Sequence, residues 1–546
     1  MKRRFFLASG SATFAAGLRP AGALVPKASL RDRLTTRAES SNYQQTSSYA
    51  DVQAFLSELD LRGAPIFRGS LGKSASGRQI PFVIASRPRV VSPEAARALN
   101  RPIVYVQAAL RGNEVDGKEA ILAILRDLCV STDKTLLDDL VLAIVPMANP
   151  DGCERYGPQA RNAPDQNGPA RIGIAPNAQG IDLDRDFVKL EAPETRAILA
   201  FINAWQPDVF VDLRTAGGSF YDYSVTYAPS LHPAAFFGGT YARDKLLPAV
   251  HAELHTKFGV ETFPCGQFGR TRALPAPPPP SDVANYGWFA PDYRPRHPAN
   301  YLGLRGPVAV LAESYSHDTL EQRVFTTRAF VESLFGNCSD QDDAILANSK
   351  TVSHWVGGAV PIRATFPAKA PSVQTIAWEN LALNSDAEAD PEPGVPRDLK
   401  RTDTFSTAPM PVYDRFVPTL YVTQTKGYLI PYEYSGPIKP LLDRHGLVHT
   451  ISIAAERVTV QQFVVDLVDR DAVALDGQRT VAISGRWRAP IPYAATFGAL
   501  TIPCVQPLGP LVSVLLEPES DDSFFTWNAF DGMLKPGYLA PVYRLI

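Results

Sequence analysis

Cysteine is scarce in this chain of 546 residues. Five occur, at Cys129, Cys153, Cys265, Cys338 and Cys504. Their number is odd and their spacing is wide, so they match neither a disulfide scaffold nor a zinc site built from paired cysteines. One disulfide bridge is allowed if the protein is exported, and the sequence does not choose the pair.

The chain also lacks an excess of charge of either sign. It has 54 Lys and Arg residues against 56 Asp and Glu residues, a formal net charge of −2. Such a balance lacks the excess of positive charge expected of a protein that binds nucleic acid. Long apolar runs are missing as well. The N-terminal run Phe5–Leu18 is too short for a transmembrane helix, and no other segment is a candidate. We therefore expect neither a nucleic-acid partner nor a stable membrane span.

The first 23 residues have the pattern of an export signal. The basic segment Met1–Arg4 precedes the apolar run, and Ala21–Ala23 offers a cleavage site of small residues. Arg3 and Arg4, followed by Phe-Phe-Leu, resemble a twin-arginine signal, which directs folded bacterial proteins across the membrane. The sequence thus predicts a periplasmic or secreted bacterial protein.

Length and patterning indicate two globular parts, because 546 residues exceed one ordinary hydrophobic core. Residues 24–48 are polar and predict a linker. Between residues 49 and 348, apolar strand-like runs alternate with helical patterns, which predicts an α/β domain with helices on both faces of a sheet. Residues 349–546 show short alternating runs between Gly, Pro and Asp turns, which predicts a mostly β, sandwich-like domain.

Polar and charged residues follow four apolar runs of the α/β domain. They are Arg111-Gly-Asn-Glu114 after Ile103–Leu110, Asn149-Pro-Asp-Gly152 after Leu140–Met147, Arg214 after Val209–Leu213, and Glu313 after Val308–Ala312. In open α/β sheets, ligands bind in the crevice outside the carboxyl ends of the strands. We expect these residues to converge on one site.

Over roughly residues 49–336 these segments resemble the zinc carboxypeptidase family. The segment around Arg111 and Glu114 resembles the first zinc motif, in which a histidine and a glutamate three positions later bind the metal. Glu114 matches the glutamate, but Arg111 stands at the histidine. Arg214 stands at the histidine expected as third ligand. The resemblance implies a carboxypeptidase-like mixed sheet flanked by helices.

The same resemblance assigns the remaining site residues. Gly180–Phe187 resembles the segment whose asparagine and arginine hold the substrate's terminal carboxylate, and it carries Asp184 and Arg185 at those positions. Glu313 matches the catalytic glutamate. The resemblance therefore implies Glu313 as catalytic residue, Arg185 and Asp184 as substrate-binding residues, and Glu114 as the sole surviving metal ligand.

Ala175 stands where relatives carry an arginine that polarises the scissile carbonyl. Arg161 or Arg171 offers a replacement.

Arginine at two ligand positions changes the expected chemistry. A guanidinium stays protonated and has no lone pair for a metal, and a catalytic zinc generally needs three protein ligands. We therefore expect no zinc cofactor. Two guanidiniums do carry a charge similar to that of the missing cation, so they can pair with carboxylates in its place. The candidate partners are Glu114, Glu313, Asp184 and Asp212.

Other residues give weaker indications of a site. His251 and His255 are spaced i, i+4 as a zinc-binding pair requires, but the segment lacks the glutamate of metalloprotease helices. His317 lies four residues after Glu313 and could line the same cleft. Glu114 and Arg185 could also serve only as internal salt-bridge partners.

Three functions remain open from the sequence. The first is a degenerate peptidase that binds the carboxyl ends of peptides, including peptidoglycan peptides, with zinc-dependent hydrolysis lost or strongly reduced. The second is an active metallocarboxypeptidase with zinc and an unusual ligand set. The third is a structural or interaction protein that acts through its β domain.

Overall fold

The computed structural model describes residues 34–131, 134–269, 273–274, 283–352, 357–384, 393–423, 425–475 and 477–546. The predicted export signal, residues 1–23, and the first part of the predicted linker lie outside these ranges. No helix in the described ranges is long and apolar enough to cross a membrane. All five cysteines are buried as free thiols.

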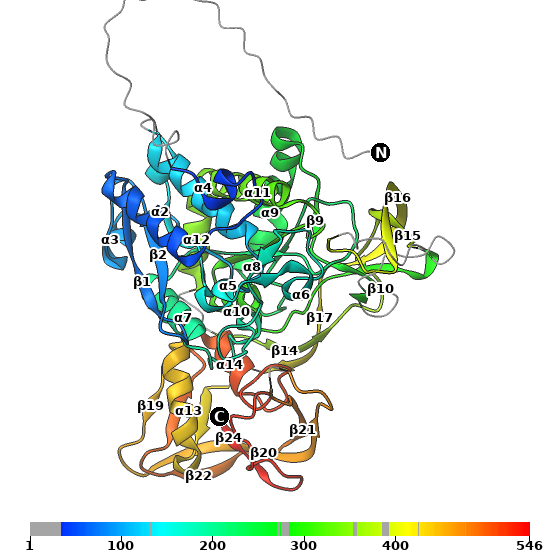
Figure 1. Cartoon of the computed structure of the whole chain (residues 1–546). Helices are drawn as coiled ribbons and strands as arrows, with labels where there is room; N and C mark the ends of the chain where they lie inside the picture. The colour runs from blue at the N-terminus through cyan, green and yellow to red at the C-terminus, as the bar shows by residue number, and fades with distance from the viewer. Residues whose placement is uncertain are drawn as a thin grey trace, which may run out of the picture.

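An eight-stranded mixed sheet forms the centre of the first part of the chain (Figure 1). In spatial order its strands are β1 (Ile66–Lys73), β2 (Gln79–Ala85), β4 (Val141–Val145), β3 (Ile103–Ala108), β7 (Val209–Thr215), β13 (Val308–Ser314), β8 (Val225–Pro229) and β9 (Thr262–Pro264). The four inner strands β4, β3, β7 and β13 run parallel, so their carboxyl ends meet at one edge.

Both faces of this sheet are buried, as expected for parallel strands with continuous apolar runs. In β3, Val104 and Val106 contact one hydrophobic core, whereas Ile103 and Tyr105 contact the other. The first core is covered by α2 (Tyr49–Leu61), α4 (Asp116–Val130), α9 (Leu247–Glu253), α11 (Leu320–Asp340) and α12 (Asp342–Val352). The second is covered by α3 (Pro93–Ala98), α7 (Pro193–Trp205) and α10 (Pro298–Arg305). The predicted carboxypeptidase-like α/β fold is confirmed.

Residues 34–48 differ from the predicted linker, because they pack against the α/β domain. They include the short helix α1 (Arg37–Ser40), whose Ala38 is fully buried. Buried Glu119 of α4 accepts hydrogen bonds from the backbone of Ser47, at 2.6 Å, and from the hydroxyl of Thr46, at 2.8 Å. The polar composition of this segment predicted a linker, because the contacts that hold it against the domain are themselves polar.

Beyond residue 349 the chain is rich in antiparallel sheet, as predicted. A seven-stranded sheet contains β19 (Thr450–Ile451), β23 (Leu500–Pro503), β18 (Gly427–Ile430), β24 (Leu539–Leu545), β20 (Glu456–Arg470), β21 (Val481–Trp487) and β22 (Ile491–Ala495). It packs with α13 (Tyr432–His445) and α14 (Gly509–Leu516), and β14 (Val360–Thr365) pairs with β17 (Val417–Val422) beside it.

One hairpin from this region lies apart from the seven-stranded sheet. It consists of β15 (Ser372–Leu383) and β16 (Leu399–Tyr413), drawn in yellow in Figure 1. Strand β16 pairs in parallel with β12 (Gly287–Phe289), which continues through β10 (Gln267–Gly269) to β11 (Ala273–Leu274). The hairpin therefore completes a sheet that the first part of the chain begins.

Candidate functional site

The carboxyl ends of the inner strands border a cavity of about 460 Å³. Its lining includes the six residues that the family resemblance assigned to ligand, substrate-binding and catalytic positions, namely Arg111, Glu114, Asp184, Arg185, Arg214 and Glu313. Arg214 and Glu313 are direct partners in the parallel pairing of β7 with β13. The strand topology therefore brings together residues that are far apart in the sequence.

Three glycines fix the loop that carries Arg111 and Glu114. Gly112, Gly152 and Gly173 pack against one another so closely that a Cβ atom on Gly112 would lie 2.2 Å from the backbone of Gly152. A Cβ on Gly173 would lie 2.4 Å from the Gly152 carbonyl oxygen. Any larger residue would force these loops apart, which explains why glycine occurs in each segment.

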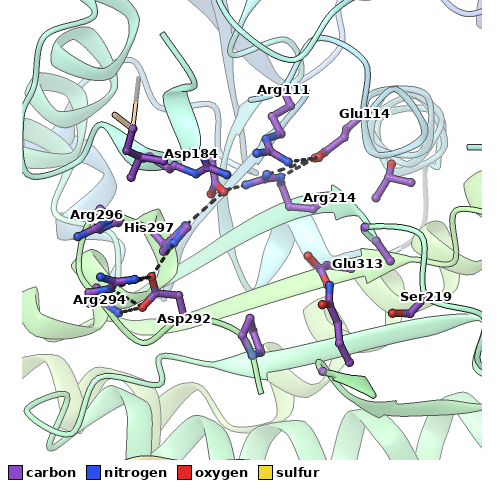
Figure 2. Close-up of a pocket in the computed structure, with 18 of the residues that line it drawn as sticks. Arg111, Glu114, Asp184, Arg214, Ser219, Asp292, Arg294, Arg296, His297 and Glu313 are labelled. Carbon is purple, nitrogen blue, oxygen red and sulfur yellow. Dashed lines mark hydrogen bonds and ion pairs between the residues drawn. The ribbon is translucent and has the colours of Figure 1, made fainter. Parts of the chain in front are cut away.

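Arg214 forms the centre of the charged site (Figure 2). Its Nε donates to Glu114 Oε2 at 2.5 Å, and its Nη1 donates to Asp184 Oδ1 at 2.6 Å and to Asp212 Oδ2 at 3.4 Å. Its side chain is only 6% exposed. One guanidinium thus binds three carboxylates from three separate segments, as a metal ion would.

Arg111 binds a carboxylate that the sequence analysis did not name. Its Nε donates to Asp182 Oδ1 at 3.1 Å, and its Nη2 also donates to Asp182. Its Nη1 lies 3.7 Å from Glu114 Oε1. The expected pairing with Glu114 is therefore a longer ion pair, and Asp182 makes the forked contact.

A second charged wall faces Arg214 across Asp184. His297 Nδ1 lies 3.2 Å from Asp184 Oδ2, and its Nε2 lies 3.6 Å from Asp292. Arg294 donates to both oxygens of Asp292, at 2.8 and 2.9 Å. Figure 2 shows this chain of contacts from Arg214 through Asp184 and His297 to Asp292. The charges of the pocket form one connected network.

Burial and neighbouring charges set the protonation of this network. Burial raises the pKa of Glu114 to about 7, although the guanidiniums of Arg214 and Arg111 oppose the rise. For His297, burial lowers the pKa, but Asp184 and Asp292 outweigh it and raise the value to about 9. Asp184 is also buried, yet Arg214 and His297 hold its pKa well below the usual range. At neutral pH the His297 imidazole is therefore a cation between two carboxylates.

Glu313 lies on the border between this cavity and a smaller one of about 120 Å³ behind it. Burial raises its pKa, and the nearby charge of Arg214 opposes that rise. A carboxyl group with a raised pKa is suited to proton transfer. The raised pKa of Glu313 is compatible with the expected role of general base, but the activated water that such a base deprotonates in a zinc enzyme needs a metal.

The residues present do not fit zinc. Glu114, Asp184 and Asp212, the carboxylates at the centre, already accept hydrogen bonds from Arg214. A cationic guanidinium occupies their shared centre, and it offers no lone pair. Across the ranges that the structure describes, no group of three or more His, Cys, Asp and Glu side chains is arranged to hold a metal ion.

The other sequence candidates do not line the cavity. Arg161 donates to the adjacent Asn162, and Arg171 is exposed at the short strand β6 (Arg171–Ile172). His251 is hydrogen-bonded to Thr262 and His255 to Glu261, so the two rings do not converge on one point. His317 stacks on Phe220, with ring centroids 3.8 Å apart.

Sequence reasoning missed Asp182 and the segment from Asp292 to His297. The segment Pro-Asp-Tyr-Arg-Pro-Arg-His, residues 291–297, directly precedes α10 and places four ionisable side chains other than tyrosine within six positions. That density of charge before an apolar helix was an available indication. Arg296 of this segment forms a buried ion pair with Asp522, at 2.9 Å, so the C-terminal region holds it in place.

Part of this chain is similar to known carboxypeptidases. A family model described as zinc carboxypeptidase matches residues 55–236. Carboxypeptidase D of Homo sapiens is 31% identical over 217 residues, which cover 37% of this chain and 14% of the relative. Carboxypeptidase 2 of Trichophyton tonsurans is 28% identical over 157 residues, covering 27% of this chain and 25% of the relative. The matches therefore span a minor part of each relative's length.

Solved structures show weaker similarity. A metallo-carboxypeptidase from Pseudomonas aeruginosa, in complex with (2-guanidinoethylmercapto)succinic acid, has 18% identity and a TM-score of 0.39. The match covers 55% of this chain and 70% of that one. A metallo-carboxypeptidase from Burkholderia cenocepacia has 16% identity and a TM-score of 0.38, with 54% and 69% covered.

Proposed function

We propose that this chain is a degenerate member of the zinc carboxypeptidase family, whose model matches residues 55–236. In this proposal it binds the carboxyl ends of peptides and has lost, or strongly reduced, zinc-dependent hydrolysis. The position of Arg214 carries the proposal. Its guanidinium lies among Glu114, Asp184 and Asp212, where it supplies the positive charge of a metal without the ability to activate water.

Arg185 is the residue we assign to the peptide's carboxylate. Its side chain lines the cavity, is 33% exposed, and lies 3.8 Å from Asp182. Arg214, by contrast, is committed to several short ion pairs. A guanidinium that is held loosely at the wall of a pocket can offer two parallel N–H groups to a carboxylate.

The ligand follows from the proposed location. An export signal of the twin-arginine type would bring the protein to the bacterial periplasm or beyond, where the peptide tails of the cell wall have free carboxyl ends. We propose these tails, or other peptides with a free terminal carboxylate, as ligands.

A binding titration tests the proposal. Peptides with a free carboxyl end and the same peptides with an amidated end should be compared by calorimetry at neutral pH. Amidation removes the negative charge, so we expect at least about tenfold weaker binding, which corresponds to about 1.4 kcal/mol. Equal affinity for both forms would contradict the assigned carboxylate site.

A further inference from the structure

A second, more apolar cavity lies beside the charged one. Its volume is about 550 Å³, and its apolar lining includes Pro164, Phe220, Leu381, Val395 and Leu399. Asp165 and Arg397 also line it, so its rim is not purely apolar. The two cavities differ in chemistry, because five arginines line the first.

The two cavities meet at the turn after Arg214. Gly217 lines both of them, while Ser219 lines the charged cavity and Phe220 the apolar one. Figure 2 shows Ser219 at the edge of the charged cavity, on the side of Glu313 and opposite Asp292. The two cavities are therefore neighbours on either side of this turn.

The hairpin β15–β16 supplies one wall of the apolar cavity. Leu381 lies on β15, and Leu399 begins β16. Both lie outside the residues that match the family model, 55–236. This wall is thus a feature of the chain's own C-terminal region.

Buried contacts hold the hairpin firmly against the site. Arg401 of β16 donates to both oxygens of Glu379 in β15, at 2.6 and 2.8 Å, and Glu379 is fully buried. Arg401 also donates to the backbone carbonyl of His317 at 3.0 Å. His317 lies just beyond β13, the strand that carries Glu313, so the hairpin has a fixed position relative to the charged cavity.

We propose that the apolar cavity binds an apolar side chain of a peptide, located upstream of the terminal residue whose carboxylate lies in the charged cavity. This inference rests on the proposed function, because the carboxylate determines which end of the peptide enters. An extended peptide suits the site, since it can pass along one continuous turn with charge at its end and side chains before it. The ligands are thus peptides with a free carboxyl end and an apolar residue before it.

Gly217 lines both cavities. A Cβ atom built on it meets nothing closer than the side-chain amide nitrogen of Gln267, at 3.7 Å, and Gln267 itself lines the charged cavity. The fold therefore accepts a substitution there, and a larger side chain would take up space where the two cavities adjoin. The neighbouring Gly218 has a φ of +83° and does not accept substitution in the same way.

The test uses a series of peptides with a free carboxyl end. In each, one of the residues before the last is leucine and the others are glycine, and an all-glycine peptide serves as reference. At one position, leucine should tighten binding about tenfold, as expected for partial burial of an apolar side chain. The same series with amidated ends distinguishes failure of the carboxylate site from failure of the apolar cavity.

Two variants locate the effect. In Leu381→Glu a charge enters the apolar cavity, so a peptide with leucine at the favoured position should bind no more tightly than the all-glycine peptide. Leu383→Glu is the matched control, because Leu383 is on the same strand and 77% exposed. Gly217→Leu should also remove the advantage, because its side chain would fill space where the two cavities adjoin.

The outcomes separate the two proposals. If free ends bind and amidated ends do not, but leucine helps at no position, the apolar cavity is refuted and the carboxylate site stands. If amidated peptides bind as tightly as those with free ends, or no peptide binds, the inference fails together with the proposed function. A leucine advantage that survives both Leu381→Glu and Gly217→Leu would place the apolar contact elsewhere and overturn the inference.

Discussion

Two arginines of this chain, Arg214 and Arg544, pair with carboxylates in different ways. Arg544 in the C-terminal sheet donates from Nε and Nη2 to the two oxygens of Glu517, both at 2.7 Å, and its guanidinium stacks on Trp487. Tyr428 donates to the same carboxylate at 2.7 Å. Glu517 is 1% exposed. This is a closed pair in which one partly buried cation meets one buried anion.

Arg214 instead shares its charge among several carboxylates and faces a cavity. Its shortest contacts join two different acids, Glu114 and Asp184, and the cavity lies beside all three residues. The difference separates a structural ion pair from an open charged network, which we propose takes the place of a metal centre. In the closed pair, both oxygens of Glu517 accept hydrogen bonds from Arg544. In the open network, the single cation Arg214 binds carboxylates from separate segments that border a cavity.

The largest effect on stability is expected at the closed pair. Arg544→Met leaves Glu517 buried without its cation, which should lower the free energy of unfolding by ~3–5 kcal/mol. Urea denaturation measures this loss. Peptide affinity should not change, because Arg544 is remote from the cavity lining. Arg486→Met is a control, since Arg486 forms an exposed pair with Asp466 and should cost ~0–1 kcal/mol.

A smaller loss is expected at the open network. Arg214→Met should cost ~2–3 kcal/mol at pH 7, because water in the cavity solvates the abandoned carboxylates. Asp184 is buried, yet Arg214 and His297 hold its pKa well below the usual range. Without the Arg214 guanidinium this pKa rises, so the variant takes up a proton that the natural protein does not, and its deficit should shrink as the pH falls from 7 to roughly 5.5. If Arg214→Met lost as much free energy of unfolding as Arg544→Met, and at every pH, the closed pair and the open network would not differ in the way described.

His297 gives the network a dependence on pH. Its pKa is raised from 6.5 to about 9 in the folded protein. The stabilisation is therefore fully present below pH 6.5 and is lost as the pH rises through about 9. From roughly pH 6 to pH 10 the natural protein should lose ~2 kcal/mol more than His297→Gln, which has no charge to lose. Parallel unfolding curves for the two proteins across this range would show that His297 is not a cation in the pocket.

The smallest effect on the fold is expected at Arg185. Arg185→Ala should change the free energy of unfolding by no more than ~0.5 kcal/mol, because its ion pair is long and partly exposed. It should weaken binding of a peptide with a free carboxyl end about tenfold, while binding of the amidated peptide stays unchanged. Arg171→Ala, at an exposed arginine outside the cavity, is the matched control.

The sequence predicted the part of the site that lies on strands. Continuous apolar runs identified β3, β7 and β13, and parallel pairing makes their ends converge on Arg111, Arg214 and Glu313. Pairing of Arg214 with Glu114 was also expected from charge alone.

Other parts depend on contacts that leave no local pattern. Asp182 lies in a turn 71 positions along the chain from Arg111, and the two residues meet only in the folded structure. The hairpin β15–β16 was expected in a separate domain, but it pairs with β12, a strand of three residues. Neither a turn nor so short a strand has a periodic pattern that could place it in space.

The zinc content of the natural protein tests the central claim most directly. Native mass spectrometry after exposure to zinc and buffer exchange should compare it with Arg111→His/Arg214→His, in which imidazoles replace both guanidiniums. We predict no stoichiometric zinc in the natural protein and one bound zinc in the double variant, since two imidazoles and Glu114 then provide three ligands. One tightly held zinc per natural chain, lost in Glu114→Gln, would contradict the replacement of the metal by arginine.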